Sequence, residues 1–230
     1  MLEGLKRWLS GSGPDSKQGA ARIDMAALQK WSRAPQLQIR TPREAEGVII
    51  DGRSDDVAWR LEWGAPQRPY VLGHELRIRA ELPLPGDLQL IVLNKVLQEA
   101  IEKTMFEQFV EGVQTRIDTE TPAEMRWVVM YPKLKGTELG DLRDRFAAAS
   151  NNTTWLQDWL GGPLGAGLKG LKIEPATALV LMIGRARVTL RTECEDPSPQ
   201  AFEPMLRVFE TALREARRVA DAGHKAAPED

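Results

Sequence analysis

The chain of 230 residues is long enough to bury one large core, and its 42% hydrophobic and 28% charged residues are typical of a globular protein. Its formal net charge of −2 excludes a strong overall attraction to nucleic acid or to an anionic membrane. Its single cysteine excludes an internal disulfide framework, and no apolar run approaches the ~20 residues of a membrane-spanning helix, so we expect a cytoplasmic protein. Arginine and alanine are plentiful and lysine is scarcer, a usage expected of a GC-rich bacterial genome.

The first 21 residues are expected to form a flexible tail. Residues 1–9 are amphipathic, with leucines and Trp8 around Lys6 and Arg7, and a Gly/Ser-rich linker follows. A segment this short is not a stable helix in water by itself, so only weak peripheral membrane contact is expected from it. We expect residues 22–222 to form a single domain and residues 223–230 to be a disordered tail.

The domain is predicted to begin with a helix from Asp24 to Arg33, with Asp24 as its N-cap. Runs of β-forming residues separated by turn residues then predict five strands, at Leu37–Arg40, Val48–Asp51, Val57–Trp63, Tyr70–Leu82 and Leu88–Asn94. Apolar residues at every fourth position predict a helix from Lys95 to Val113.

The second half is predicted to mix strands and helices. Met125–Tyr131 is expected to be a strand, preceded by at most one helical turn at residues 121–124. Residues 141–171 are expected to be loosely helical with a break at Asn151, and Leu179–Thr192 to be either a hairpin turning near Gly184 or one long bent strand. A final helix begins near Pro197 and is predicted to bury Phe202, Met205 or Leu206, Phe209, Leu213 and Ala216.

Because the strands are grouped instead of alternating with helices, the predicted fold class is α+β. We expect a mainly antiparallel sheet with helices packed on one face and a C-terminal helix. This order of elements is loosely similar to that of small secretion-chaperone domains, a similarity of element order alone.

Arginines occupy alternate positions in two strand-like runs, residues 75–82 and 184–191. They are Arg77, Arg79, Arg185, Arg187 and Arg191. Successive side chains of a strand point to opposite faces. We therefore expect apolar residues to be buried together on one face, namely Leu76, Ile78, Ala80, Leu82, Val188 and Leu190. The five arginines would lie on the other face and form the candidate binding surface.

The same count places Glu62, Glu75 and Glu81 on the arginine face, so its charge is mixed, as on an ordinary solvent-exposed sheet surface. Arg60 and Arg126 lie in other predicted strands and could join the array. Guanidinium groups bind carboxylate or phosphate bidentately. Nucleic acid is not expected, because stacking aromatic residues are missing from the arginine runs.

The sequence contains no residue set that supplies a nucleophile, a base and an orienting group together. His74 and His224 are far apart and form no zinc-ligand pattern. Cys194 lies between Glu193 and Glu195, whose charges disfavour a thiolate. We expect no cofactor and no metal, and an enzyme is not the favoured interpretation.

Two other motifs are interpreted as structural. Residues 165–170 match the dinucleotide-binding pattern by letter, but no strand precedes them. From residue 156 to residue 168, leucines recur at every fourth position and predict an amphipathic segment that packs on the sheet or on a partner. They are Leu156, Leu160, Leu164 and Leu168. The acidic cluster Asp118, Glu120 and Glu124 is interpreted as solvated loop carboxylates.

These observations favour a non-catalytic cytoplasmic interaction protein, such as an adaptor, a chaperone-like factor or an assembly component, with another protein as its partner. The alternative is a regulatory module that binds an anionic small molecule on the arginine-bearing face. The sequence does not indicate an oligomeric state.

Overall fold

The computed structural model describes residues 23–33, 37–42, 46–110 and 121–226. The predicted amphipathic segment at residues 1–9 and the linker after it lie outside these residues. In the described part of the chain, no helix is long and apolar enough to cross a membrane.

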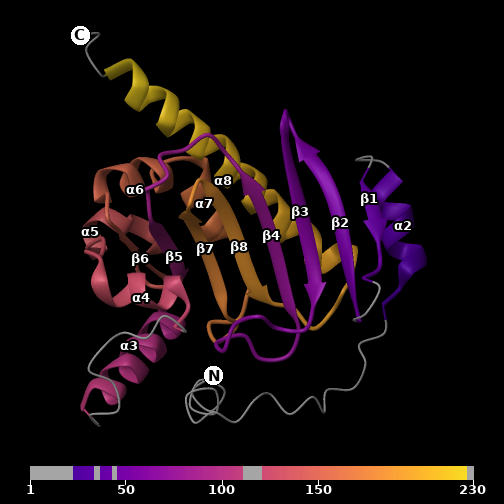
Figure 1. Cartoon of the computed structure of the whole chain (residues 1–230), viewed down its shortest axis with the longest axis horizontal. Helices are drawn as coiled ribbons and strands as arrows, with labels where there is room; N and C mark the ends of the chain where they lie inside the picture. Colours follow the sequence, from indigo (N-terminus) through magenta and orange to yellow (C-terminus); the bar gives the residue numbers. More distant parts are fainter. Residues whose placement is uncertain (1–22, 34–36, 43–45, 111–120, 227–230) are drawn as a thin grey trace.

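An eight-stranded antiparallel sheet forms the centre of the molecule (Figure 1). Its strands are β1 (Gln38–Arg40), β2 (Gly47–Ser54), β3 (Val57–Gly64), β4 (Glu75–Glu81), β5 (Leu90–Asn94), β6 (Phe146–Ser150), β7 (Leu179–Gly184) and β8 (Arg187–Glu193). The spatial order is β1-β2-β3-β4-β8-β7-β5-β6, so the late hairpin β7–β8 is inserted between β4 and β5. The prediction of an α+β fold with a mainly antiparallel sheet and a C-terminal helix is confirmed.

One face of the sheet is covered by helices that share a single apolar core. These are α6 (Thr153–Leu160), α7 (Pro163–Gly170) and α8 (Pro199–Ala226), and α8 crosses the sheet diagonally in Figure 1. The predicted apolar positions of β4 and β8 are buried there, and so are the predicted residues of α8 and the leucines at every fourth position of α6 and α7. The Trp159 indole donates to the Ala212 carbonyl oxygen at 3.0 Å and fastens α6 to α8. The glycines that resemble a nucleotide motif therefore lie inside a packed helix.

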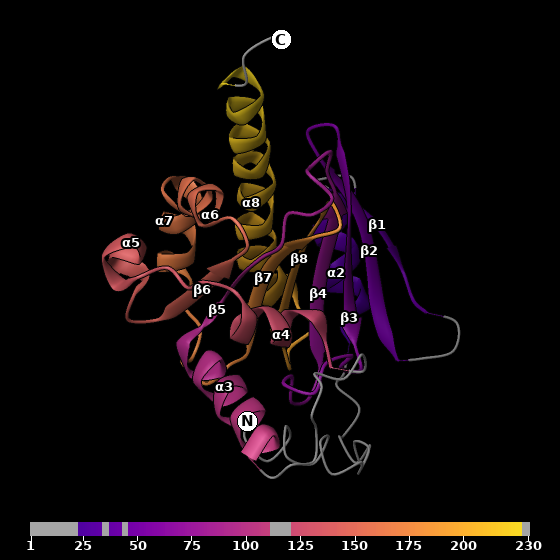
Figure 2. The ribbon, with the colours of Figure 1, turned by 60° about the vertical axis from the view of Figure 1, so that its left-hand side comes forward.

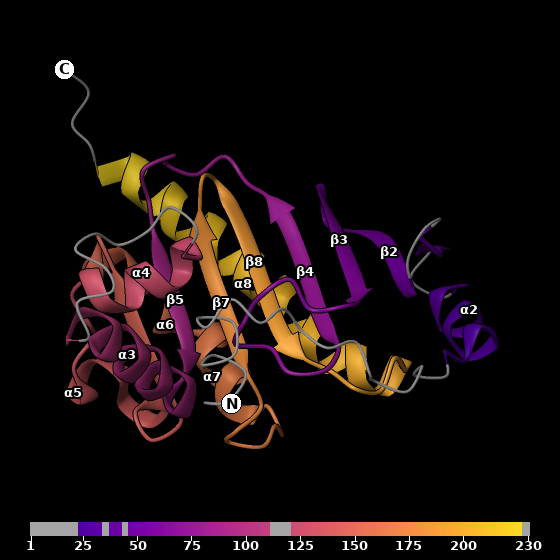
Figure 3. The same ribbon diagram turned by 60° about the horizontal axis from the view of Figure 1, so that its bottom comes forward.

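Within the described residues, the helices on the opposite face lie at the β7–β5–β6 end of the sheet. Helices α3 (Lys95–Val110) and α4 (Ala123–Met130) lie there, as Figures 2 and 3 show. The ring of Trp127 on α4 lies over Gly184, where an added Cβ would overlap it. On this face, none of the helices in the described part of the chain lies over β2, β3, β4 or most of β8, and we call this region the open face.

A second apolar cluster fills the space beneath α3 and α4. Leu97 and Ile101 of α3 are fully buried there, and they pack with Ile91 and Val180 of the sheet. The cluster therefore belongs to α3, α4 and the strands beneath them, and it does not extend over the open face.

Two predicted elements are wrong. Met125–Tyr131 forms helix α4 instead of a strand, because a helical turn places Met125 and Val128 together against β5 and β6. Strand β6 lies within the stretch predicted to be helical, after the short helices α5 (Gly136–Leu139) and η1 (Gly140–Leu142). Its small residues Ala147 and Ala149 face the second cluster.

The predicted cap of the first helix and the predicted hairpin agree with the fold, whereas the strand predicted over Tyr70–Leu82 is shorter and begins at Glu75. Helix α2 (Met25–Arg33) begins after Asp24, whose carboxylate accepts from the Ala27 backbone N–H at 3.0 Å. The hairpin β7–β8 turns just after Gly184, at two residues with positive φ, Arg185 (53°) and Ala186 (55°). Helix α8 continues to Ala226 and so includes the first residues of the predicted C-terminal tail.

Candidate functional site

Four of the five predicted arginines share the open face. Strand pairing places Arg77 of β4 opposite Arg191 of β8, and Arg79 lies one rung further along β4 on the same face. Arg187 lies opposite Glu81. The apolar residues between these positions are buried under α8, as the alternation predicted.

Arg185 and Arg126 do not belong to this array. Arg185 lies in the hairpin turn, outside β8, so the alternation of β8 does not orient it. Arg126 lies on helix α4 instead of a strand. Arg60, by contrast, lies on β3 directly opposite Arg79 and joins the open face.

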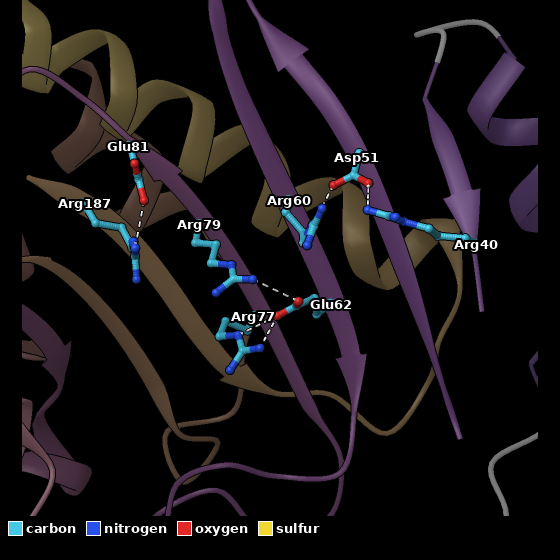
Figure 4. Close-up of polar contacts among 8 residues, drawn as sticks. All are labelled: Arg40, Asp51, Arg60, Glu62, Arg77, Arg79, Glu81 and Arg187. Atoms are coloured by element: carbon cyan, nitrogen blue, oxygen red, sulfur yellow. Dashed lines mark hydrogen bonds and ion pairs between the residues drawn. The ribbon is translucent and has the colours of Figure 1, made fainter. Parts of the chain in front are cut away.

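Ion pairs connect the charged residues of the open face (Figure 4). Asp51 accepts hydrogen bonds from Arg40 and from Arg60, the latter at 2.7 Å. Glu62 accepts from Arg77 at 2.9 Å and from Arg79 at 3.2 Å.

A separate pair joins Arg187 to Glu81 at 2.7 Å, also drawn in Figure 4. The other four arginines, Arg40, Arg60, Arg77 and Arg79, share only the two carboxylates of Asp51 and Glu62. With Arg40 of the edge strand β1 included, their charges leave an excess of two positive charges across β1, β2, β3 and β4.

Arg40, Arg60 and Arg79 are the accessible members of this group. Their side chains are 54%, 38% and 36% exposed, whereas Arg77 is 13% exposed. Arg60 and Arg79 lie directly opposite each other on neighbouring strands, and like charges in this arrangement are destabilising. Each guanidinium has five N–H donors, and only Nε of Arg60 and one terminal nitrogen of Arg79 donate to these carboxylates. Both groups can therefore bind a further anion.

The electrostatic coupling of Asp51 is reflected in its pKa. Partial burial, the largest single effect, acts to raise the pKa of Asp51, but the hydrogen bonds and charges of Arg60 and Arg40 outweigh it and lower the pKa. The hydrogen bond to Asp51 raises the pKa of Arg60. Both groups are therefore charged at neutral pH.

Arg191 is the one predicted binding residue that the fold withdraws from the surface. It donates to Glu75, and both side chains are almost fully buried. A second buried contact lies nearby, in which the Tyr70 hydroxyl donates to Glu124 at 2.9 Å and Arg68 pairs with the same carboxylate. Burial, and then the charge of Glu124, raise the pKa of Tyr70 well above its ordinary value. These residues hold the loop before β4 in place.

The other chemically notable residues have structural partners. The backbone and ring nitrogens of His74 contact Glu195 at 3.1 and 3.2 Å, and its ring stacks on Trp63. Burial, and then the charge of Asp196, raise the pKa of Cys194 to about 12. Among the described residues, no group of three or more His, Cys, Asp or Glu side chains could hold a metal ion. Asp118 and Glu120 lie outside the described residues.

Sequence reasoning missed the acidic partner at the centre of the site. The strand predicted to end at Asp51 continues to Ser54, so Asp51 lies within β2, opposite Arg60. The available signal was strand parity: Val48 and Ile50 point to the apolar core, so Asp51 points to the opposite face. The chain matches no protein-family model, and it shows no significant similarity to a curated protein or to a solved structure.

Proposed function

We propose that this protein is a non-catalytic interaction protein whose open face binds an acidic segment of another protein. The observation that carries the proposal is the excess of two positive charges on four arginines that share Asp51 and Glu62. A partner with clustered carboxylates would complete the pairing of Arg60 and Arg79.

Charge complementarity supports a protein partner, because the charged rungs extend over several neighbouring strands. Arg40, Arg60, Arg79 and Arg187 come from four different strands. An extended or helical acidic segment could contact several of them at once. Guanidinium groups bind carboxylates with charge-assisted hydrogen bonds that are stronger than neutral ones.

The test uses binding of a fluorescein-labelled peptide of twelve alternating Glu and Ser residues, with a Gln/Ser peptide as the neutral counterpart. The variant Arg60→Glu/Arg79→Glu is compared with Arg207→Glu/Arg214→Glu, which makes the same charge change at exposed positions of α8. We expect the first variant to weaken binding of the acidic peptide by about a hundredfold, and the second to weaken it by less than about threefold.

Binding of the acidic peptide should also weaken with added salt, because exposed charges are screened. The proposal is wrong if the neutral peptide binds equally well, or if both double variants lose affinity to the same extent. Circular dichroism of each variant establishes that the fold is retained.

A further inference from the structure

A cavity of about 710 Å³ lies at one end of the open face. We call it the end cavity. Its volume is within the range of small-ligand sites, roughly 300–1,000 Å³. Four arginines line it, together with three carboxylates and an apolar floor: Arg60, Arg79, Arg187, Arg217, Asp51, Asp56, Glu81, Val57, Ala58, Trp59, Ala80, Leu82 and Pro83.

The divergence of two neighbouring strands accounts for this cavity. The last paired residues of β3 and β4 at this end are Trp59 and Ala80, but β3 begins two residues earlier, at Val57. The chain that leaves β4 is held to the other hairpin by a hydrogen bond from the Leu82 N–H to the Ala186 carbonyl oxygen at 2.9 Å.

On the other side of the end cavity, the β2–β3 turn is held to α8. Arg217 donates two hydrogen bonds to the Asp56 carboxylate, one of them at 2.7 Å. Both walls of the cavity are therefore held apart by contacts of the native fold, so the site does not depend on a ligand to open it.

The lining of the end cavity has more donors than acceptors. Arg79 and Arg187 each make one hydrogen bond to a carboxylate through a terminal nitrogen, which leaves other N–H groups for a ligand. The Trp59 side chain is not one of these donors, because it packs in the apolar core on the α8 side of the sheet, over Gly52 of β2. The occupant that fits this lining carries several acceptor oxygens and negative charge.

We propose that the end cavity binds a phosphate monoester. One such group carries nearly two negative charges at neutral pH and three acceptor oxygens. It would bind beside four arginines whose charges exceed those of the three lining carboxylates. The phosphate could come from either of two sources. One is a phosphorylated side chain of the acidic partner, in which case the inference rests on the proposed function. The other is a free phosphorylated metabolite, which has the same chemistry.

The experiment measures three probes by isothermal titration calorimetry against the full chain. They are the pentapeptide Glu-Asp-Ser-Asp-Glu, the same peptide phosphorylated on serine, and free O-phosphoserine. We expect the phosphopeptide to bind at least about tenfold more tightly than the unmodified peptide. Arg187→Ala should remove about tenfold of the phosphopeptide affinity, whereas Arg207→Ala should leave it unchanged.

A second variant guards against loss of binding through misfolding. Glu81 is 76% exposed and competes for Arg187, so Glu81→Gln should leave the fold intact and tighten phosphopeptide binding by about threefold. A folding defect cannot produce this gain. If Glu81→Gln weakens binding, the assignment of the site is wrong.

The outcomes separate this inference from the proposed function. If both peptides bind equally, the phosphate site is refuted and the acidic-segment proposal stands. If free O-phosphoserine binds as tightly as the phosphopeptide, the cavity is supported and a small-molecule ligand is favoured over a protein partner. If none of the three probes binds, both proposals fail.

Discussion

Arg191 of β8 forms an ion pair with Glu75 of β4, and the two side chains are only 7% and 3% exposed. Removing one partner of a buried ion pair leaves an uncompensated charge and costs about 3–5 kcal/mol. We therefore expect Glu75→Ala to lower the free energy of unfolding by about 3 kcal/mol, as measured by urea denaturation.

The matched control for this prediction is Glu81→Ala. Glu81 lies on the same strand and face and also pairs with an arginine, but it is 76% exposed, so its loss should cost less than about 1 kcal/mol. Equal effects of the two substitutions would show that burial does not determine how much these ion pairs contribute to the free energy of unfolding.

Gly184 is required at its position because the Trp127 ring lies where a Cβ would be. Gly184→Ala should force the ring to move and destabilise the protein by about 1–3 kcal/mol. The control is Gly86→Ala, since nothing lies within 4 Å of a Cβ at Gly86. Thermal unfolding of both variants tests the prediction, and a stable Gly184→Ala protein would contradict it.

Cys194 should be unreactive in the native protein because burial raises the pKa of its thiol to about 12. At pH 9 the native thiolate fraction should be roughly several hundredfold smaller than in the unfolded chain, so iodoacetamide should react correspondingly more slowly than in urea. The unfolded chain loses this proton at a lower pH than the folded chain, so the contribution of Cys194 to stability falls as the pH rises from about 9 to about 12. Rapid native alkylation at pH 9 would contradict this assignment.

Asp56 should titrate far below its usual range, because hydrogen bonds from Arg217 hold its pKa at about 2. Since the folded-state pKa is depressed, the stabilising contribution of this contact is present above the unfolded-state pKa and is lost as the pH falls toward about 2. Carbon-13 NMR of the aspartate carboxyl groups measures the midpoint. Arg217→Ala should raise the Asp56 midpoint toward 3.8, its ordinary value, and an unchanged midpoint would rule out the contact with α8.

The errors in predicted secondary structure have a common cause. Residues 125–131 are rich in β-forming side chains, and Phe146–Ser150 is rich in alanine, which favours helices. Tertiary packing reversed both preferences, because the small residues of β6 leave room for the helices that pack against it. Local propensity contributes less free energy than the burial of these apolar surfaces.

The candidate site was only partly predictable for a similar reason. Alternation along a strand is a local property, and it correctly separated Arg77 and Arg79 from the apolar residues between them. It could not reveal that Asp51 would pair with Arg60, or that Arg191 would form a buried ion pair with Glu75. Each of these contacts depends on how separate strands are aligned.

Local patterns in the chain were sufficient to predict the fold class, the buried side of α8 and the face on which most strand residues lie, because side-chain periods of 2.0 and 3.6 residues are set by the local backbone. Which charges meet depends instead on the tertiary structure. Insertion of β7–β8 between β4 and β5 placed Arg77 beside Arg191, and the incomplete helical layer left Arg60 and Arg79 accessible. Strand order and helix placement depend on contacts between distant segments, and no local pattern encodes them.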